Sequence, residues 1–243
     1  MKQQKYIWIL AAALLAACVA ARAQQAELEA FQQAAGDRSA LYRGLLAENS
    51  TVPANGHPYW DTPEYLRGDI VLEGNLYRDV PLNINAQTQH ALVRTSNQVF
   101  SIMLSPVQVS ALDIDGRHFV GIGPDEGALP EGFYEILGQG GVCVYKHVDK
   151  RLQSSVSDSN GDRIGYYDPN YRSDIFNYYA YLSAYYFRDR DGQFTRIRNR
   201  GALLREFPDK RKMIRKAVQD AGLLQPGSSF DAFCKAVLNL AGE

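Results

Sequence analysis

The chain has 243 residues, and its 26 Lys and Arg nearly balance its 27 Asp and Glu, while hydrophobic residues make up 46%. This composition supplies enough apolar chain for a packed core in one large domain or two small ones. Beyond the N-terminal segment no stretch is long and apolar enough to span a membrane, which argues against a membrane-spanning protein.

The first 23 residues read as a secretory signal peptide. A short positive start precedes an uncharged apolar run, and Ala21-Arg22-Ala23 forms an A-x-A cleavage site before Gln24. The same segment contains Leu15-Ala16-Ala17-Cys18, which matches the bacterial lipobox, after which the cysteine is lipidated. We therefore expect either a free periplasmic or secreted protein that starts at Gln24, or an outer-membrane lipoprotein anchored by acyl chains on Cys18.

Residues 24–68 read as a short helical segment followed by a loop. The apolar residues of 26–47 follow a helical spacing, and Ser39 can cap a second short helix that runs through Leu46. Residues 49–68 carry proline and glycine at short intervals, which is typical of a loop.

From residue 69 to residue 150 the hydrophobic period changes to two. Val80, Leu82 and Ile84 alternate with polar residues and predict a half-buried strand, in which Pro81 indicates an edge or an irregularity. The same spacing predicts seven more strands, at 69–74, 89–95, 98–104, 107–115, 118–123, 132–138 and 141–147. Asp115-Gly116 marks a tight hairpin turn between two of these strands.

Residues 151–243 read as a Tyr-rich hairpin followed by two helices. Aromatic residues are dense from Ile175 to Phe187, and the turn signal Asp191-Gly192 predicts a long hairpin over 178–198. Apolar stripes at helical spacing then predict helices over 209–221 and 229–241.

These elements predict an α+β fold. Short strands at hairpin spacing favour an antiparallel β meander, which forms a sandwich, a curved sheet or a partial barrel. Helices of the βαβ type are absent, so a parallel sheet is not expected. We expect the hairpin and the C-terminal helices to pack as one unit with the β region.

The strand and turn patterns resemble a family of uncharacterised secreted or envelope proteins from Bacteroidota. The resemblance rests on 68–74, 77–85, 132–146 and 185–207, and it covers most of 60–222. It implies an envelope protein with an N-terminal β region and a helical end, and it supports cleavage before Gln24. The family carries no assigned activity, so no catalytic residue transfers to this chain.

Tyrosines give the best functional signal in the mature chain. Eight of the 15 lie between residues 166 and 186. In a strand, Tyr178 and Tyr186 would share one face, and Tyr185 would lie on the other. Aromatic rings with a polar group suit glycan stacking and protein interfaces, so Tyr178, Tyr185 and Tyr186 are candidate ligand-binding residues, with ordinary packing as the alternative.

Positive charge gathers in residues 188–216, which hold 11 Lys and Arg against 4 Asp and Glu. Such a segment can bind phosphates, but an exported protein is not expected to meet nucleic acid. For Lys210, Arg211, Lys212, Arg215 and Lys216 the simpler interpretation is the solvated face of a helix. Pairing of the basic segment with the acidic first part of the chain, residues 24–187, is a further alternative. Lipid on Cys18 would be the protein's one link to a membrane.

The motifs of common enzymes and cofactor sites are absent from the sequence. There is no G-x-S-x-G, H-E-x-x-H, C-x-x-C or P-loop, and the four histidines show no ligand spacing. Asp158, Asn160 and Asp162 resemble half of an EF-hand loop, but Arg163 replaces its glycine and Pro169 its bidentate glutamate. A loose calcium site there competes with a plain Asx-rich turn. No cofactor and no catalytic residue are therefore expected.

Two further features leave alternatives open. Carboxylates at Asp125, Glu126, Glu131 and Glu135 are either solvated loop residues or part of a glycosidase pair. Cys143 and Cys234 either form a disulfide, which an oxidising envelope allows, or remain two buried thiols. A bridge would close a loop of about 90 residues and contribute roughly 4 kcal/mol.

Three functions remain open on this evidence. The first is a non-enzymatic envelope protein that binds or assembles with an unknown envelope protein or glycan. The second is a hydrolase acting on envelope glycan or peptide. The third is a structural or regulatory partner of an outer-membrane system. The absence of a catalytic constellation favours the first.

Overall fold

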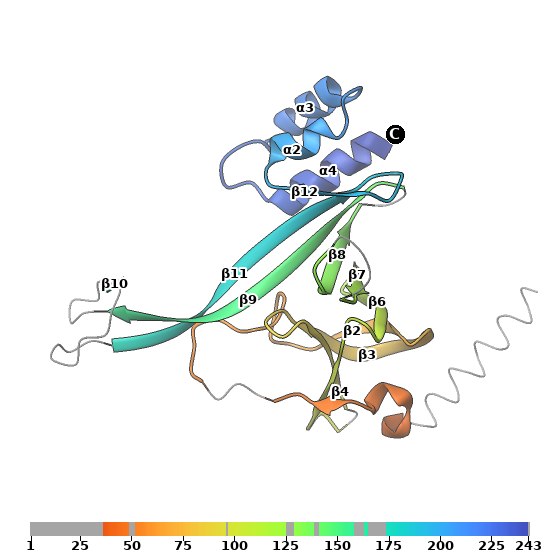
Figure 1. Cartoon of the computed structure of the whole chain (residues 1–243), viewed down its shortest axis with the longest axis vertical. Helices are drawn as coiled ribbons and strands as arrows, with labels where there is room; N and C mark the ends of the chain where they lie inside the picture. The colour runs from red at the N-terminus through yellow and green to blue at the C-terminus, as the bar shows by residue number, and fades with distance from the viewer. Residues whose placement is uncertain are drawn as a thin grey trace, which may run out of the picture.

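The computed structural model describes residues 36–48, 52–95, 97–124, 129–138, 141–157, 163–164 and 174–242. Within these residues the chain forms one large antiparallel sheet followed by helices at its C-terminal end (Figure 1). The α+β class and the antiparallel meander are thus confirmed. The predicted signal peptide, Cys18 and the start of the N-terminal helical pattern lie outside the described residues, as do Asp158, Asn160 and Asp162.

The elements follow one another in a simple order. The strands are β1 (Leu45–Leu46), β2 (Leu66–Leu72), β3 (Asn75–Asn85), β4 (His90–Arg94), β5 (Ser101–Leu104), β6 (Val109–Ile114), β7 (Arg117–Ile122), β8 (Gly132–Leu137), β9 (Cys143–Ser157), β10 (Arg163–Ile164), β11 (Asp174–Arg188) and β12 (Phe194–Ile197). The helices are the 3₁₀ turns η1 (Gly36–Arg38) and η2 (Ala40–Tyr42) and the α-helices α2 (Arg200–Arg205), α3 (Arg211–Asp220) and α4 (Phe230–Gly242).

The sheet consists of two meanders that meet at β2. Its strand order is β1-β5-β4-β3-β2-β6-β7-β8-β9-β11-β12, with β10 paired to β9, and every neighbouring pair is antiparallel. All eight strands predicted between residues 69 and 147 are present. Asp115 and Gly116 join β6 to β7 with φ of 51° and 68°, the left-handed backbone that a two-residue hairpin turn requires.

Pro81 lies in β3 where the pairing is irregular, as its ring predicts. It pairs with Arg67 of β2, while the pairing of β3 with β4 begins one residue later, at Leu82. The β2–β3 register shifts beside it, between Gly68 and Ile70. A residue without an N–H is tolerated here because no β4 carbonyl stands opposite it.

The N-terminal prediction is wrong where the structure describes it. Residues 36–42 form two 3₁₀ turns, and the helix predicted through Leu46 is replaced by β1, which pairs with β5 through Leu45 and Met103. Ser39 does stand at the N-cap of η2, but its side chain makes no capping hydrogen bond. Pairing with a distant strand edge has overridden a weak local helix pattern.

Strands β9 and β11 are longer than predicted and form the arm of the molecule. Both have 15 residues, and they pair along their whole length, from Cys143 with Arg188 to Ser157 with Asp174. Figure 1 shows their outer halves projecting beyond the rest of the sheet. Residues 153–157 belong to this arm, and β9 crosses residue 150, where a segment boundary was expected.

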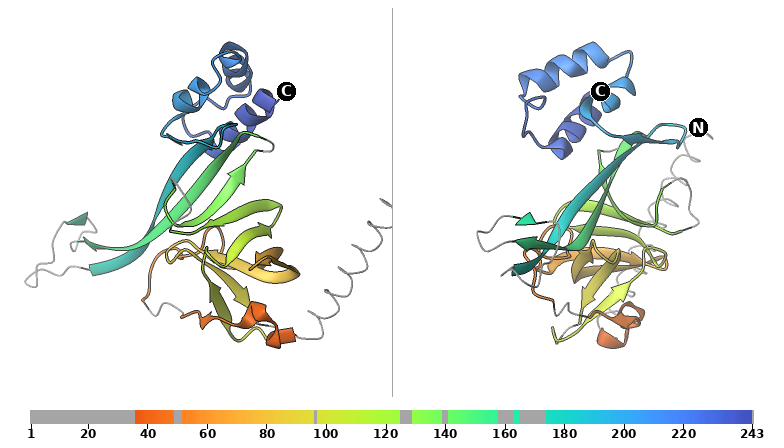
Figure 2. Two further views of the ribbon diagram at one scale, coloured as in Figure 1. Left: turned by 45° about the vertical axis from the view of Figure 1, so that its right-hand side comes forward. Right: turned by 60° about the vertical axis from the view of Figure 1, so that its left-hand side comes forward.

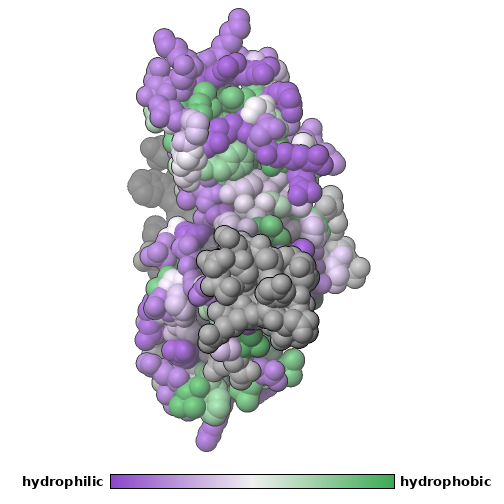
Figure 3. Space-filling model, turned by 90° about the vertical axis from the view of Figure 1, so that its left-hand side faces the viewer, coloured by the Kyte–Doolittle hydropathy of each residue, from purple (hydrophilic) through white to green (hydrophobic). Residues whose placement is uncertain are grey.

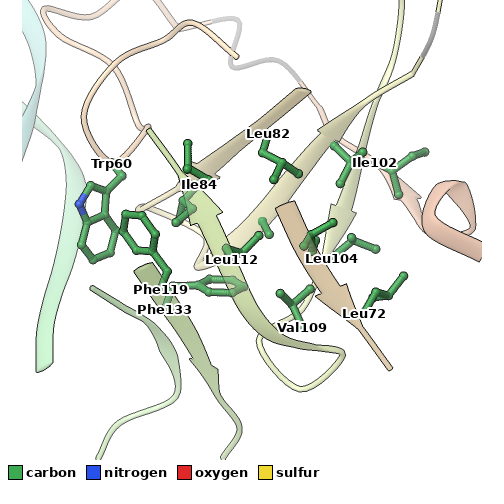
Figure 4. Close-up of a cluster of buried hydrophobic side chains, with 14 of the residues drawn as sticks. Trp60, Leu72, Leu82, Ile84, Ile102, Leu104, Val109, Leu112, Phe119 and Phe133 are labelled. Carbon is green, nitrogen blue, oxygen red and sulfur yellow. The ribbon is translucent and has the colours of Figure 1, made fainter. Parts of the chain in front are cut away.

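The main hydrophobic core lies within the curve of the sheet and is built by β2 to β9. Figure 4 shows Leu82 and Ile84 of β3 in one cluster of buried side chains with Leu112 of β6 and Phe133 of β8. Trp60 closes one side of this core, because its ring meets the Phe119 ring edge-on at a centroid distance of 5.3 Å.

A second core joins the helices to the far end of the sheet (Figure 2). Leu137 of β8, Val144 of β9 and Phe187 of β11 pack there with buried residues of α2, α3 and α4, such as Phe233. A smaller cluster around Tyr134 covers the opposite face of the same strands.

The two predicted C-terminal helices are confirmed as α3 and α4, and α2 is an addition. Asn199 caps α2 by accepting a hydrogen bond from the N–H of Ala202 at 2.9 Å. Among the described residues, none of the helices has the length and apolar character needed to cross a membrane.

Candidate functional site

The most distinctive surface feature is a cleft where β12 leaves the edge of β11. It has a volume of about 650 Å³, and we call it the edge cleft. Its lining comes from β11, from the end of β12 through the start of α2, and from the first residue of α4: Ser183, Ala184, Tyr185, Arg196, Ile197, Arg198, Asn199, Arg200, Gly201 and Phe230.

The local sequence explains why the edge opens at this point. Strand β12 pairs with β11 only from Arg188 back to Tyr185, which faces Ile197. Two residues later Asn199 caps α2, so the chain turns away from the sheet instead of continuing along it. Farther along the same edge of β11, Asn55 forms an isolated parallel bridge with Tyr178. A gap in the pairing of this edge therefore lies between Asn55 and β12.

The gap leaves a short length of β11 with an open edge, Ala180–Ala184. Asn55 donates its N–H to the Asn177 carbonyl at 2.8 Å and accepts from the Tyr179 N–H at 3.0 Å, so odd-numbered residues of β11 point their backbone groups outward. The unbroken register with β9 carries this alternation on to Tyr181 and Ser183. No other described strand pairs with that stretch.

Tyr185 connects the edge cleft to a row of charged side chains. Its hydroxyl donates to Asp231 at 2.7 Å, and the Lys146 ammonium donates to the other oxygen of the same carboxylate at 2.5 Å. Lys146 lies 3.9 Å from the Glu135 carboxylate, which accepts two hydrogen bonds from Arg117 at 2.8 and 3.1 Å. This row holds the start of α4, and with it Phe230, against the sheet.

The row and its two outer members, Asp61 and Lys235, form what we call the charged layer. Asp61 binds Arg117 at 3.0 Å from an exposed position, and Lys235 lies 4.0 Å from Glu135. The layer separates the core of the sheet from the core of the helices. It contains three cations and three carboxylates in all, so its charges balance, and we assign it a structural role.

Electrostatics keeps Lys146, Arg117 and Tyr185 protonated. Burial by itself would lower the pKa of Lys146, but the hydrogen bond from Lys146 to Asp231 and the nearby negative charges raise it overall. The same balance, with Glu135 as the main partner, raises the pKa of Arg117. Burial, together with the hydrogen bond to Asp231, raises the pKa of the Tyr185 hydroxyl, so it stays a donor.

The rim of the edge cleft is positively charged. Arg196 and Arg198 are exposed, and neither forms an ion pair with another described residue. Arg200 lies deeper, where it donates to the carbonyls of Leu223 and Ser228. No Asp or Glu lines the cleft.

The three tyrosines predicted to bind ligand do not gather at one place. Tyr178 and Tyr186 lie on one face of β11 and Tyr185 on the other. The Tyr178 hydroxyl donates to Gln153 at 2.8 Å, and the Tyr186 ring lies 6.2 Å from that of Tyr134. Tyr185 alone lines the edge cleft, and there its ring meets the Phe230 ring edge-on at 4.6 Å.

Sequence reasoning missed most residues of the edge cleft. Among the large hydrophobic residues of the arm, Tyr181 and Leu182 are the most exposed, at 52% and 44%. The hairpin predicted over 178–198 includes Arg196 and Arg198, and they do lie in β12 and the following connection, but the sequence does not indicate that they line a cleft. Their distribution along the sequence carried no signal, because only the folded sheet brings them beside Ser183.

The basic residues of α3 fit the simpler interpretation of that segment. Lys212, Arg215 and Lys216 are exposed, and Ile214 and Val218 of the same helix are buried. In the face shown in Figure 3 the helical end is covered mainly by hydrophilic side chains.

The remaining candidates are placed as follows. Glu131 is exposed and Glu135 is bound by Arg117, while Asp125 and Glu126 lie outside the described residues. No group of three or more His, Cys, Asp or Glu side chains in the described part of the chain is arranged to hold a metal ion.

Cys143 and Cys234 are both free and buried in this structure. Burial raises the pKa of both thiols, that of Cys234 to about 12. The two thiols therefore stay protonated at neutral pH and behave as small hydrophobic side chains.

A second cleft, of about 670 Å³, lies between the sheet and α4, and Glu135 is one of its lining residues. At its mouth the His118 ring nitrogen Nδ1 lies 2.7 Å from the Asp113 carboxylate. Its lining residues are Asp113, Gly116, Arg117, His118, Glu135, Ile136, Gly138, Lys235 and Asn239, so it offers no hydroxyl or thiol nucleophile.

Comparison with known proteins adds no relative. No family model matches the chain, and neither a curated protein nor a solved structure is significantly similar to it.

Proposed function

We propose that this protein is a non-enzymatic binding or assembly module of the bacterial cell envelope. The observation that carries the proposal is the arm of β9 and β11, which presents exposed Tyr181 and Leu182 beside an open strand edge and a cationic cleft. Exposed aromatic and aliphatic side chains next to exposed arginines are the composition of a protein interface. The partner is an envelope protein or glycan, and the work requires no cofactor.

The charged layer supports a binding role over a catalytic one. Its buried carboxylate, Glu135, is already held by Arg117, and its ammonium, Lys146, is held by Asp231. Groups that are paired in this way serve to position α4, because a proton transfer from either would leave a buried charge without its partner.

The location follows from the N-terminal sequence. The protein reaches the periplasm or the cell exterior after cleavage before Gln24, or it stays at the outer membrane through lipid on Cys18. Intact mass measurement on protein from native envelopes separates the two, since only a lipoprotein would start at Cys18 and carry the extra mass of acyl chains. A chain that still begins at Met1 would contradict both.

Photo-crosslinking tests the binding function. The purified mature chain would carry benzoylphenylalanine in place of Tyr181, or in place of exposed Lys212 on α3 as the matched control, and each would be irradiated with native envelope fractions. We expect covalent adducts from position 181 and none from position 212. Equal adducts at both positions, or none at position 181, would contradict a binding role for the arm.

A hydrolase acting on envelope glycan or peptide is the second candidate, because His118 and Asp113 stand together at the mouth of the second cleft. A carboxylate that orients a histidine can help it activate water. Hydrolysis of nitrophenyl glycosides or nitroanilide peptides that disappears in His118→Ala would favour this candidate. Equal turnover by the variant, or none by either protein, would exclude His118 from such a reaction.

A further inference from the structure

We propose that the open edge of β11 binds an extended acidic peptide segment, which adds to the sheet as a short strand between Asn55 and β12. This inference rests on the proposed binding function and names the chemistry of its partner. The observations behind it are the backbone edge, the cations beside it and the exposed side chains that flank it.

The backbone edge is suited to a strand because two segments of this chain already use it. Asn55 occupies it at Asn177 and Tyr179, and β12 occupies it from Tyr185 onward. Between them, Ala180–Ala184 spans about 17 Å at ~3.4 Å per residue. The outward N–H and C=O groups of Tyr181 and Ser183 offer two donors and two acceptors, which is the recognition mode of strand addition.

The charge of the edge cleft selects an acidic segment. A peptide strand paired with Tyr181 and Ser183 would reach Arg198 at the point where β12 turns away, with Arg196 on the same rim. Guanidinium groups bind carboxylates with two parallel hydrogen bonds, and no acidic residue in the part of the chain that the structure describes binds these two arginines. A basic segment would meet uncompensated repulsion there.

Exposed side chains on the two faces of the edge favour alternation in the peptide. Tyr181 is 52% exposed on one face of β11, and Leu182 is 44% exposed on the other. A strand laid along the edge alternates its own side chains between these faces. An acidic residue every second position, with an apolar residue between, therefore places carboxylates on one face and apolar contacts on the other.

Binding of synthetic peptides to the full mature chain tests this proposal. The probe is a fluorescein-labelled (Glu-Val)₄ peptide, and its binding is followed by fluorescence anisotropy. We expect saturable binding that weakens at least tenfold for (Lys-Val)₄. It should also weaken at least tenfold for a (Glu-Val)₄ peptide N-methylated at every residue, which has no N–H to donate to the strand ladder. Equal binding of all three peptides, or no binding of (Glu-Val)₄, would overturn the proposal.

Variants of the protein locate the binding on the edge. Arg196→Glu combined with Arg198→Glu should weaken binding of (Glu-Val)₄ at least tenfold, whereas Arg205→Glu, an exposed arginine of α2 outside the cleft, should leave it unchanged. Ser183→Pro removes an outward N–H that β9 does not use, and it should also weaken binding at least tenfold. Equal loss of binding in the Arg205→Glu control, or full binding by the double variant, would show that (Glu-Val)₄ does not bind at the edge cleft.

Amide hydrogen exchange gives a readout that is independent of whether Ser183→Pro folds. Bound (Glu-Val)₄ should slow exchange at Tyr181 and Ser183 while leaving the amides of α3 unaffected. Heparin, an anionic polysaccharide, serves as a control. If it binds as tightly as (Glu-Val)₄ without protecting these amides from exchange, the cleft recognises negative charge alone and strand addition is overturned. Crosslinks from position 181 that persist when no peptide binds would leave the binding function standing and reject only its peptide partner.

Discussion

Two carboxylates bind the same arginine in very different surroundings, and the contrast shows what burial does to an ion pair. Glu135 is 4% exposed and Asp61 is 75% exposed, yet both accept hydrogen bonds from Arg117. An exposed pair is screened by water and contributes little. A buried carboxylate, once removed, leaves the cations that surrounded it without compensation.

Replacing each carboxylate by alanine should separate the two cases. We expect Glu135→Ala to lower the free energy of unfolding by about 3–5 kcal/mol, because Arg117 and Lys146 lose their buried partner. Asp61→Ala should cost less than about 1 kcal/mol. Urea unfolding of both variants measures the difference, and equal losses would show that the charged layer does not stabilise the protein.

The buried thiols give a second prediction at the scale of single residues. Cys143 and Cys234 are shielded and protonated, so the native mature chain should react slowly with iodoacetamide at neutral pH. In denaturant, and without prior reduction, both should be alkylated, which intact mass records as two additions. A protein that takes up label only after reduction would instead carry the disulfide.

At the scale of elements, neighbouring segments of the sheet approach so closely that some positions have room only for glycine. Gly121 of β7 is an example. A side chain there would collide with the backbone carbonyls of Val109 and Pro106. Backbone atoms cannot rotate away, so the strands themselves would have to move apart.

Gly121→Ala should therefore destabilise the protein by roughly 1–3 kcal/mol. Gly141→Ala is the matched control, because the nearest atom to its added methyl would be Arg190 Cγ at 4.0 Å. Thermal unfolding of the two variants compares them directly. A melting temperature for Gly121→Ala equal to that of the control would show that β6 and β7 are less closely packed than described.

The strands that the sequence predicts pack one face against a hydrophobic core, and the strand segments that it misses do not. Val80, Leu82 and Ile84 alternate with polar residues because one side of β3 faces the core, and this alternation predicts a strand. The outer half of β9 is held mainly by its pairing with β11, so its side chains show no such pattern. Strand β1 is two residues long and exists because β5 stands beside it.

The edge cleft shows the same limit for the candidate site. Tyr185 was predicted from composition, and it does line the cleft. Ser183, Arg196 and Arg198 are ordinary residues in sequence, and they meet because β12 ends where α2 begins. The cleft exists because strand pairing along β11 stops at this point, and no local sequence pattern marks such a site.

At the scale of the whole molecule, two partly buried histidines link stability to pH. Burial lowers the pKa of His147, whose Nδ1 lies 3.1 Å from the Phe133 carbonyl, and burial with the nearby Lys150 lowers that of His57. Below the unfolded value of about 6.5, the unfolded chain binds more protons than the folded protein. The stabilisation is therefore fully present above that pH and is lost as the pH falls through it.

We expect the free energy of unfolding to decrease between pH 7 and pH 5, and His147→Gln to reduce that dependence. Urea titrations at several pH values measure the slope for both proteins. A slope that is identical in the variant would show that His147 does not contribute to the pH dependence of stability.

The separation of the two cores by the charged layer has a consequence for the order in which the parts of the chain can be completed during synthesis. The core of the sheet draws on residues between Leu41 and Val148, so it can close while the C-terminal half is still confined. The second core needs Phe233, Cys234 and Val237 of α4, the last helix to appear. Without α4, Lys146 has no Asp231 to bind and Tyr185 has no helix against it, so the edge cleft is complete only when the last helix has joined the sheet.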